Sequence, residues 1–136
     1  MINSNWKIID TNIFVDWLME VRSSDEMQII FSEPVYLNYN ILTELTNFLQ
    51  NRYSHYHALE SLNLILENPG QFLFLPVNDL LIFDAQKIMD KYQSAQYSWS
   101  DSLIIAQAEF YSLKVLTQDR KMTIYPNVSI SNPFHD

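Results

Sequence analysis

The chain of 136 residues contains no cysteine and a single glycine, Gly70. Without cysteine it can form no disulfide, iron–sulfur cluster or thiolate zinc site, and it has no cysteine nucleophile. This absence is compatible with a reducing cytoplasm. One glycine cannot build a Gly-rich phosphate loop or a dinucleotide-binding fingerprint. The two shortages therefore exclude several common kinds of cofactor and nucleotide site.

Basic residues are also few: 8 Lys and Arg stand against 16 Asp and Glu, giving a net charge of −8. This balance argues against a surface that coats nucleic acid non-specifically. The negative charge does not exclude a nuclease, because the acidic residues of a nuclease can bind the metal cations that contact a phosphate group of the substrate. No apolar run approaches the roughly 20 residues of a membrane-spanning helix, and the N-terminus has no signal-peptide pattern. We expect a soluble, cytoplasmic protein without a membrane partner.

What is present indicates one globular domain over residues 1–136, since 48% of the residues are hydrophobic and 18% are charged. Short apolar runs predict strands at 6–9, 35–37, 72–75, 113–117 and 128–131. A tight turn is predicted at 10–12. Helical periodicity then predicts helices from 13 to about 22, from 40 onward, at 55–67, at 79–92 and at 98–112, while 23–32 is ambiguous. This alternation is typical of an α/β domain with a central, mostly parallel, twisted sheet.

Four acidic residues have unusual positions in this pattern. Asp10 and Asp119 follow predicted strands, whereas Glu44 and Asp101 lie on the apolar faces of predicted helices. Ligands of open parallel sheets bind beyond the carboxyl ends of the strands, so all four can point to one end of the sheet. Carboxylates placed together raise one another's pKa unless a cation compensates them. A site with carboxylate ligands alone suits Mg²⁺ or Mn²⁺.

Each acid also has a purely structural interpretation, and these alternatives stay open at the level of sequence. Asp101 and Ser98 have the spacing of a helix capping box. Asp10 could cap a turn or helix, and Asp119 could form a turn. Glu44 could pair with an arginine or lie at the edge of its apolar stripe. The joint placement of four acids favours a shared cation over four separate explanations.

Four segments carry a more specific likeness: IIDTNI at 8–13, LTEL at 42–45, WSDSLIIA at 99–106 and LTQDRK at 116–121. In this order they resemble the successive motifs of the PIN-domain ribonucleases, and the likeness covers nearly the whole chain. It is closest to the small bacterial type represented by VapC toxins. The chain departs from the family pattern at Ser112, where a glycine is common, and at Met122, where a bulky aromatic residue is common.

The resemblance implies a three-layer α/β/α fold and a Mg²⁺- or Mn²⁺-dependent endoribonuclease. A metal-activated water would hydrolyse RNA and leave a 5′-phosphate and a 3′-hydroxyl. The matching acids would be Asp10, Asp101 and Asp119 as metal ligands, with Glu44 helping to hold the metal or the attacking water.

The resemblance, or their position in the chain, also suggests roles for four neighbouring polar residues. Asn12 and Thr117 match positions that support the carboxylates by hydrogen bonds. Arg120 and Lys121 adjoin the expected site and could hold substrate phosphates, although both also suit an exposed turn.

The expected partners are an RNA substrate, an antitoxin protein and a second copy of the chain in a homodimer. Three alternatives remain: a PIN-like RNA-processing nuclease outside a toxin–antitoxin pair, an inactive PIN-like binding module, and a receiver-like signalling domain. The receiver alternative needs an acid at the end of a middle strand, but the run at 72–75 is followed by Pro76 and Val77.

Other polar residues are expected to be structural. Asp16 and Glu20 lie four residues apart on the first predicted helix and should be solvated, with an auxiliary role in metal binding as the alternative. His55 and His57 flank an aromatic residue, which favours a helix–helix corner or a dimer surface over stacking on RNA bases. His135 is expected to have no role.

Overall fold

The computed structural model describes residues 6–134. Its centre is a five-stranded sheet in the order β3-β2-β1-β4-β5, and all the strand pairs in the sheet are parallel. The strands are β1 (Lys7–Ile9), β2 (Val35–Leu37), β3 (Phe72–Phe74), β4 (Lys114–Leu116) and β5 (Ile130–Ser131). The α/β class and the parallel sheet predicted from the alternating pattern are therefore confirmed.

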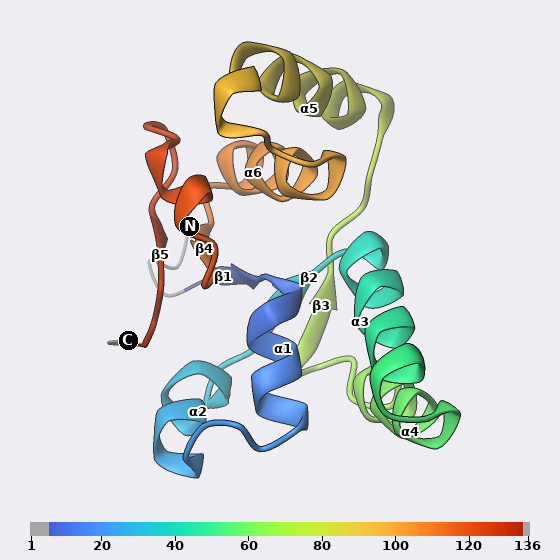
Figure 1. The fold of residues 1–136 in the computed structure, drawn as a ribbon. Helices are drawn as coiled ribbons and strands as arrows, with labels where there is room; N and C mark the ends of the chain where they lie inside the picture. Colours follow the sequence, from blue (N-terminus) through green and yellow to red (C-terminus); the bar gives the residue numbers. More distant parts are fainter. Residues whose placement is uncertain (1–5, 135–136) are drawn as a thin grey trace.

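Helices lie on both sides of the sheet, as Figure 1 shows. In that view α5 and α6 lie above the sheet, α1 and α2 lie below it, and the α3–α4 pair stands beside α1. The α-helices are α1 (Thr11–Leu18), α2 (Ser24–Phe31), α3 (Tyr39–Arg52), α4 (His55–Leu66), α5 (Asp79–Lys91) and α6 (Trp99–Tyr111). Two short 3₁₀ helices follow α5 and β4: η1 (Gln93–Ala95) and η2 (Arg120–Ile124). No helix within residues 6–134 is long and apolar enough to cross a bilayer.

The sheet is short, and helices cover both of its faces (Figure 1), so most of its side chains are buried or half-buried. Fully buried strand residues are Ile8, Ile9, Val35, Leu37 and Val115. Helix α6 supplies an unbroken buried run from Ser102 to Ala108 that packs on β1 and β4. Burying apolar side chains is worth about 1.5–3 kcal/mol each, so this layer contributes substantially to stability.

Several element boundaries differ from the sequence prediction for local reasons. The first helix ends at Leu18, not near Arg22, because Glu20 adopts a left-handed conformation with φ 54°. The ambiguous segment 23–32 contains α2, which begins with a capping box formed by Ser23 and Glu26. Helix α6 ends where Ser112 adopts φ 56°, a conformation that favours glycine.

A buried polar contact fixes α6 relative to the end of β2. Asn38 and Gln107 are both completely buried, and the Asn38 Nδ2 donates to Gln107 Oε1 over 2.6 Å. Asn38 also caps α3, since its Oδ1 accepts from the Ile41 backbone N–H. Gln107 in turn donates to the Pro76 carbonyl. These hydrogen bonds connect α6 to the start of α3 and to the segment before α5.

Candidate functional site

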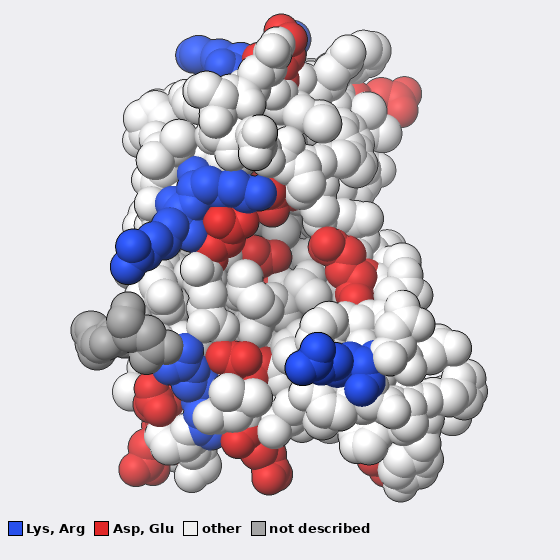
Figure 2. All heavy atoms as spheres, viewed as in Figure 1, with Lys and Arg blue, Asp and Glu red and all other residues white. Residues whose placement is uncertain are grey.

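The four acids singled out in the sequence line one open cleft of about 330 Å³ at the carboxyl end of the sheet. They come from four different elements: Asp10 follows β1, Glu44 is on α3, Asp101 is in the first turn of α6, and Asp119 precedes η2. Figure 2 shows acidic side chains gathered in a hollow at the middle of one face, with a basic side chain lying against them. The structure therefore brings the four predicted carboxylates to one place.

Asp10 is the most buried of the four, with 7% of its surface exposed. Its Oδ1 accepts from the Thr11 backbone N–H over 2.8 Å, and its Oδ2 accepts from the Thr117 hydroxyl over 2.7 Å. Burial raises the pKa of Asp10 to about 6, and the charges of Asp101 and Glu44 add to the rise, while the hydrogen bonds from Thr117 and Thr11 oppose it. Asp10 is therefore a carboxylate whose negative charge is not fully compensated.

The parallel register explains why Thr117 reaches Asp10 from more than a hundred residues away. Ile9 pairs with Leu116 across β1 and β4, so the next residue of each strand lies beside the other. Thr117 is completely buried, and its hydroxyl also accepts from the Asp119 backbone N–H over 3.0 Å. Asn12 donates to the Thr117 hydroxyl over 3.3 Å and lies 3.5 Å from Asp10 Oδ2. One hydroxyl thus orients two acidic residues.

Asp101 has both of the roles considered for it: it caps α6, and it lines the cleft. Its Oδ2 accepts from the Ser98 backbone N–H, and the Ser98 hydroxyl accepts from the Asp101 backbone N–H, each over 3.0 Å. This is a complete capping box, and it holds the side chain at the start of α6. The same carboxylate lines the cleft with 14% of its side chain exposed. The capping interaction is therefore what aims Asp101 at the other acids.

Glu44 lies differently from the prediction. The pattern placed it inward within the apolar stripe of α3, but it is exposed and stands at the edge of that stripe, on the rim of the cleft. Its Oε1 accepts from the Ser100 hydroxyl over 2.5 Å and from the Thr11 hydroxyl over 3.3 Å. Helical periodicity could not show where the buried stripe of α3 ends, because the width of that stripe depends on which other elements pack against the helix.

The two basic residues beside Asp119 behave differently from each other. Lys121 extends its side chain over the acids, with Nζ 3.5 Å from Asp101 Oδ2 and 3.7 Å from Asp119 Oδ2. Arg120 is exposed, and its guanidinium has no hydrogen bond or ion pair with any residue in the described part of the chain.

The donor set fits a hard divalent cation in its chemistry. The cleft offers carboxylate oxygens and polar oxygens from Thr11 and Asn12, and it has no histidine or thiolate. Among residues 6–134, however, no three histidine or acidic side chains already stand in a metal-ligand arrangement. Lys121 and hydrogen-bond donors already contact several of the carboxylate oxygens, so a cation would have to displace some of these contacts.

Sequence reasoning missed several side chains that shape the cleft. Ser100 and Thr11 hold Glu44, and each is adjacent in sequence to one of the predicted acids. Asp16, which was expected to be solvated, is half-buried at the cleft wall: it pairs with Arg22 over 3.2 Å and accepts from Gln118 Nε2 over 2.9 Å. One hint was present in the sequence: Gln118, which contacts Asp16, lies between Thr117 and Asp119, and both of these were predicted to belong to the site.

The remaining candidates lie away from the cleft. His55 and His57 stand exposed at the α3–α4 corner, where the Ser54 hydroxyl lies 2.7 Å from His57 Nδ1. Glu20 is exposed and lies beyond the end of α1. His135 lies outside the described residues.

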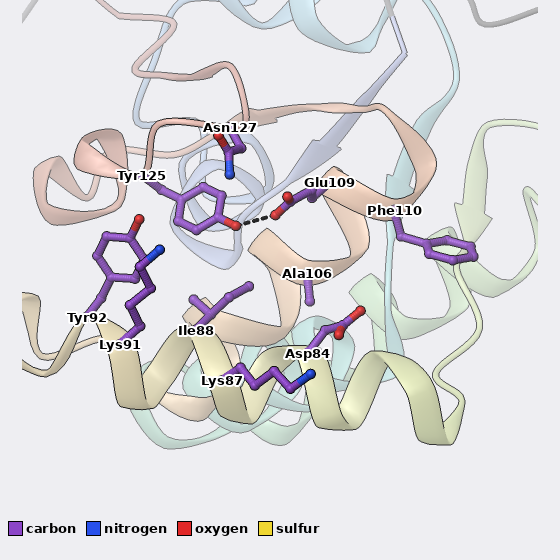
Figure 3. Close-up of a pocket in the computed structure, with 10 residues that line it drawn as sticks. All are labelled: Asp84, Lys87, Ile88, Lys91, Tyr92, Ala106, Glu109, Phe110, Tyr125 and Asn127. Atoms are coloured by element: carbon purple, nitrogen blue, oxygen red, sulfur yellow. Dashed lines mark hydrogen bonds between the residues drawn. The ribbon is translucent and has the colours of Figure 1, made fainter.

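A second cleft of about 370 Å³ lies between α5, α6 and the segment after η2, and none of the predicted site residues lines it. Figure 3 shows Tyr125 from that segment donating its hydroxyl to Glu109 of α6. Burial and this hydrogen bond raise the pKa of Tyr125, which therefore remains a neutral donor. The contact anchors the end of η2 against α6.

Comparison with known proteins agrees with this arrangement. The PIN-domain family profile matches residues 7–127. The chain belongs to the PIN-domain family. Members of this family are typically nucleases and commonly depend on metal ions. Membership also removes the receiver-like alternative considered from the sequence.

Several solved structures are similar to this PIN domain, among them a toxin–antitoxin complex from Klebsiella pneumoniae. VapBC2 from Rickettsia felis, bound to a promoter DNA fragment, matches with a TM-score of 0.73 and 14% identity, covering 93% of this chain and 97% of that chain. VapC20 from Mycobacterium tuberculosis, described as a sarcin–ricin loop cleaving toxin, matches with a TM-score of 0.74 and 16% identity, covering 90% and 96%. FitAcB from Neisseria gonorrhoeae matches with a TM-score of 0.67 and 18% identity, covering 95% and 99%. No curated protein matches the chain in sequence. At these identities the likeness shows the shared fold.

Proposed function

We propose that this PIN domain is a Mg²⁺- or Mn²⁺-dependent endoribonuclease that acts as the toxin of a toxin–antitoxin pair. The observation that carries the proposal is the convergence of four carboxylates, from four separate elements, on one open cleft. A nuclease site of this kind needs oxygen ligands grouped where a phosphate can approach, which the carboxyl end of a parallel sheet provides.

Three of the acids are suited to hold the cation. Asp10, Asp101 and Asp119 have side chains that are mostly shielded from solvent and line the cleft. Bound there, Mg²⁺ or Mn²⁺ would supply a Lewis acid for the phosphoryl group and lower the pKa of a water molecule. The raised pKa of Asp10 supports this assignment, because a divalent cation would compensate the charge that burial now disfavours.

The protein's own groups would supply orientation. Thr117 and Asn12 hold the Asp10 carboxylate in place by hydrogen bonds. Glu44 stands on the exposed rim, where Ser100 and Thr11 direct its Oε1 and its second oxygen can accept a hydrogen bond from the attacking water. Arg120 is exposed next to the last acid and can pair with a backbone phosphate of the RNA.

The partner proposal rests on the similar structures. They include a toxin–antitoxin complex from Klebsiella pneumoniae and VapBC2 from Rickettsia felis, so we propose that an antitoxin restrains this chain. The homodimer expected from the resemblance to VapC toxins stays part of the proposal. Inducing the chain in a bacterial host should arrest growth, and co-expression of the protein encoded directly upstream should restore it. Growth arrest that this neighbour fails to relieve would favour an RNA-processing nuclease outside such a pair.

The activity is tested with purified protein and a mixture of ribosomal and transfer RNA. We expect cleavage in Mg²⁺ or Mn²⁺, no cleavage in excess EDTA, and products that carry 5′-phosphate and 3′-hydroxyl ends. Asp119→Asn, purified in parallel, should be inactive and serves as the control for a contaminating nuclease. Cleavage that persists in EDTA, or that is equal in the variant, would refute the proposal. Absence of both cleavage and metal uptake would instead indicate an inactive binding module.

A further inference from the structure

We propose that Lys121 is an internal counter-ion that occupies the acid cluster in the metal-free protein and competes with the divalent cation for it. The Lys121 ammonium lies 3.5 Å from Asp101 Oδ2, 3.7 Å from Asp119 Oδ2 and 3.3 Å from the Gln96 carbonyl oxygen. It is therefore surrounded by three oxygens from three different segments. The inference rests on the proposed function, because the competing cation is the one proposed above.

The carboxylate oxygens that Lys121 contacts belong to two of the proposed metal ligands. Asp119 is held at both oxygens by the same residue, since Oδ1 accepts from the Lys121 backbone N–H over 3.2 Å and Oδ2 faces the ammonium. Asp101 Oδ2 is shared between the ammonium and the Ser98 backbone N–H. A cation that draws both aspartates onto itself must therefore displace the lysine side chain.

The backbone beneath Lys121 is fixed, so the competition involves the side chain alone. Met122 is completely buried, and its carbonyl accepts from the Tyr97 hydroxyl over 3.5 Å. Tyr125, at the end of η2, donates a hydrogen bond to Glu109 of α6. Gln96 adopts a left-handed conformation with φ 56°, which ends η1. Since these contacts anchor η2, the four-carbon lysine stem is the part that is freest to turn.

Lysine suits this role for physical reasons. Its ammonium is a compact, strongly hydrated charge on a flexible stem, so it can leave the cluster at a modest cost. With 39% of the side chain exposed, water is available to receive it. Exposed and partly exposed ion pairs are weak, so two such contacts should reduce the cation's affinity by about threefold to thirtyfold. The metal-free acids would keep a positive partner, and half-saturation with the cation would require a correspondingly higher concentration.

The test is a Mn²⁺ titration of the 136-residue chain, stripped of metal with EDTA, near pH 7.5, with free Mn²⁺ measured by electron paramagnetic resonance. Lys121→Met should bind Mn²⁺ about threefold to thirtyfold more tightly than the wild type. Arg120→Met is the matched control, because it removes the same charge one residue away without the contacts, and it should change the affinity less than about twofold. Lys121→Arg retains the charge and should stay close to the wild type.

A second readout is independent of metal binding. In EDTA, Lys121→Met should melt at a lower temperature than Arg120→Met, because Lys121, unlike Arg120, lies against Asp101 and Asp119. Affinity for Mn²⁺ in Lys121→Met that is equal to or weaker than that of Arg120→Met would overturn the inference. If the wild type binds no Mn²⁺ and Asp101→Asn behaves identically, the proposed function fails and the competition fails with it. Lys121→Gln replaces the methionine variant if the latter does not fold.

Discussion

Replacing Asp10 by asparagine should stabilise the metal-free protein near neutral pH, although it removes an acid proposed to hold the cation. Asp10 is 7% exposed, and burial, with smaller contributions from Asp101 and Glu44, raises its pKa from 3.8 to about 6. The folded state therefore binds this proton more tightly than the unfolded chain does. The free energy of unfolding must then fall as the pH rises from about 4 to about 6, and the full cost is present above that range.

The magnitude follows from the two opposing effects of the substitution. A rise of about two pKa units corresponds to roughly 3 kcal/mol, which asparagine removes because it carries no charge. Asparagine can still accept from the Thr11 backbone N–H, but its amide group would face the Thr117 hydroxyl, which now donates to Asp10. Losing that hydrogen bond costs about 1 kcal/mol. The net expectation is a gain of about 1–2 kcal/mol at pH 7.5 and a loss of about 1 kcal/mol near pH 4.

Urea unfolding in EDTA at both pH values measures this difference. Asp90→Asn is the control, because Asp90 is an exposed acid on α5 and the same substitution there should leave stability nearly unchanged at either pH. Adding Mg²⁺ should stabilise the wild type and leave Asp10→Asn unaffected. An Asp10→Asn protein that is destabilised equally at pH 4 and pH 7.5 would refute the reasoning, since the burial cost would then not depend on charge.

Three further substitutions test the framework around the cleft. Asn38→Ala should lower the free energy of unfolding by about 2–4 kcal/mol in urea, because it removes the α3 cap and leaves the buried Gln107 oxygen without its partner. Ser112→Gly should raise the melting temperature by a few degrees, about 0.5–1 kcal/mol, because Ser112 adopts a left-handed conformation that costs glycine little. Ser100→Ala should reduce RNA cleavage about tenfold with stability changed by less than about 1 kcal/mol, because it releases Glu44; cleavage at the wild-type rate would show that Glu44 needs no such support.

The pattern of strands and helices was predictable because the strands lie in short, mainly apolar runs and most helices carry an apolar stripe. Helix ends were harder, and the shortage of glycine explains why. Glu20, Gln96 and Ser112 adopt left-handed conformations in places where a glycine would have marked the end of a helix in the sequence. The predicted overrun of α1 beyond Leu18 is a direct result.

The candidate site was predictable to the extent that strand ends and helix starts determine it. Asp10 and Asp119 follow neighbouring strands, so their convergence follows from the parallel order of the sheet. The exposure of Glu44 and the reach of Lys121 to Asp101 were not predictable, because they depend on how α3 and η1 pack beside α6. Such contacts join segments far apart in sequence, and no local pattern encodes them.

The central claim is that these carboxylates act together on RNA, and cleavage by Asp101→Asn in Mg²⁺ tests it most directly. Asparagine retains the oxygen that accepts from Ser98, so the α6 cap and the fold should persist, which circular dichroism can verify. We expect cleavage to fall by about a hundredfold or more while Asp90→Asn remains as active as the wild type. Cleavage by folded Asp101→Asn within about threefold of the wild type would contradict the claim.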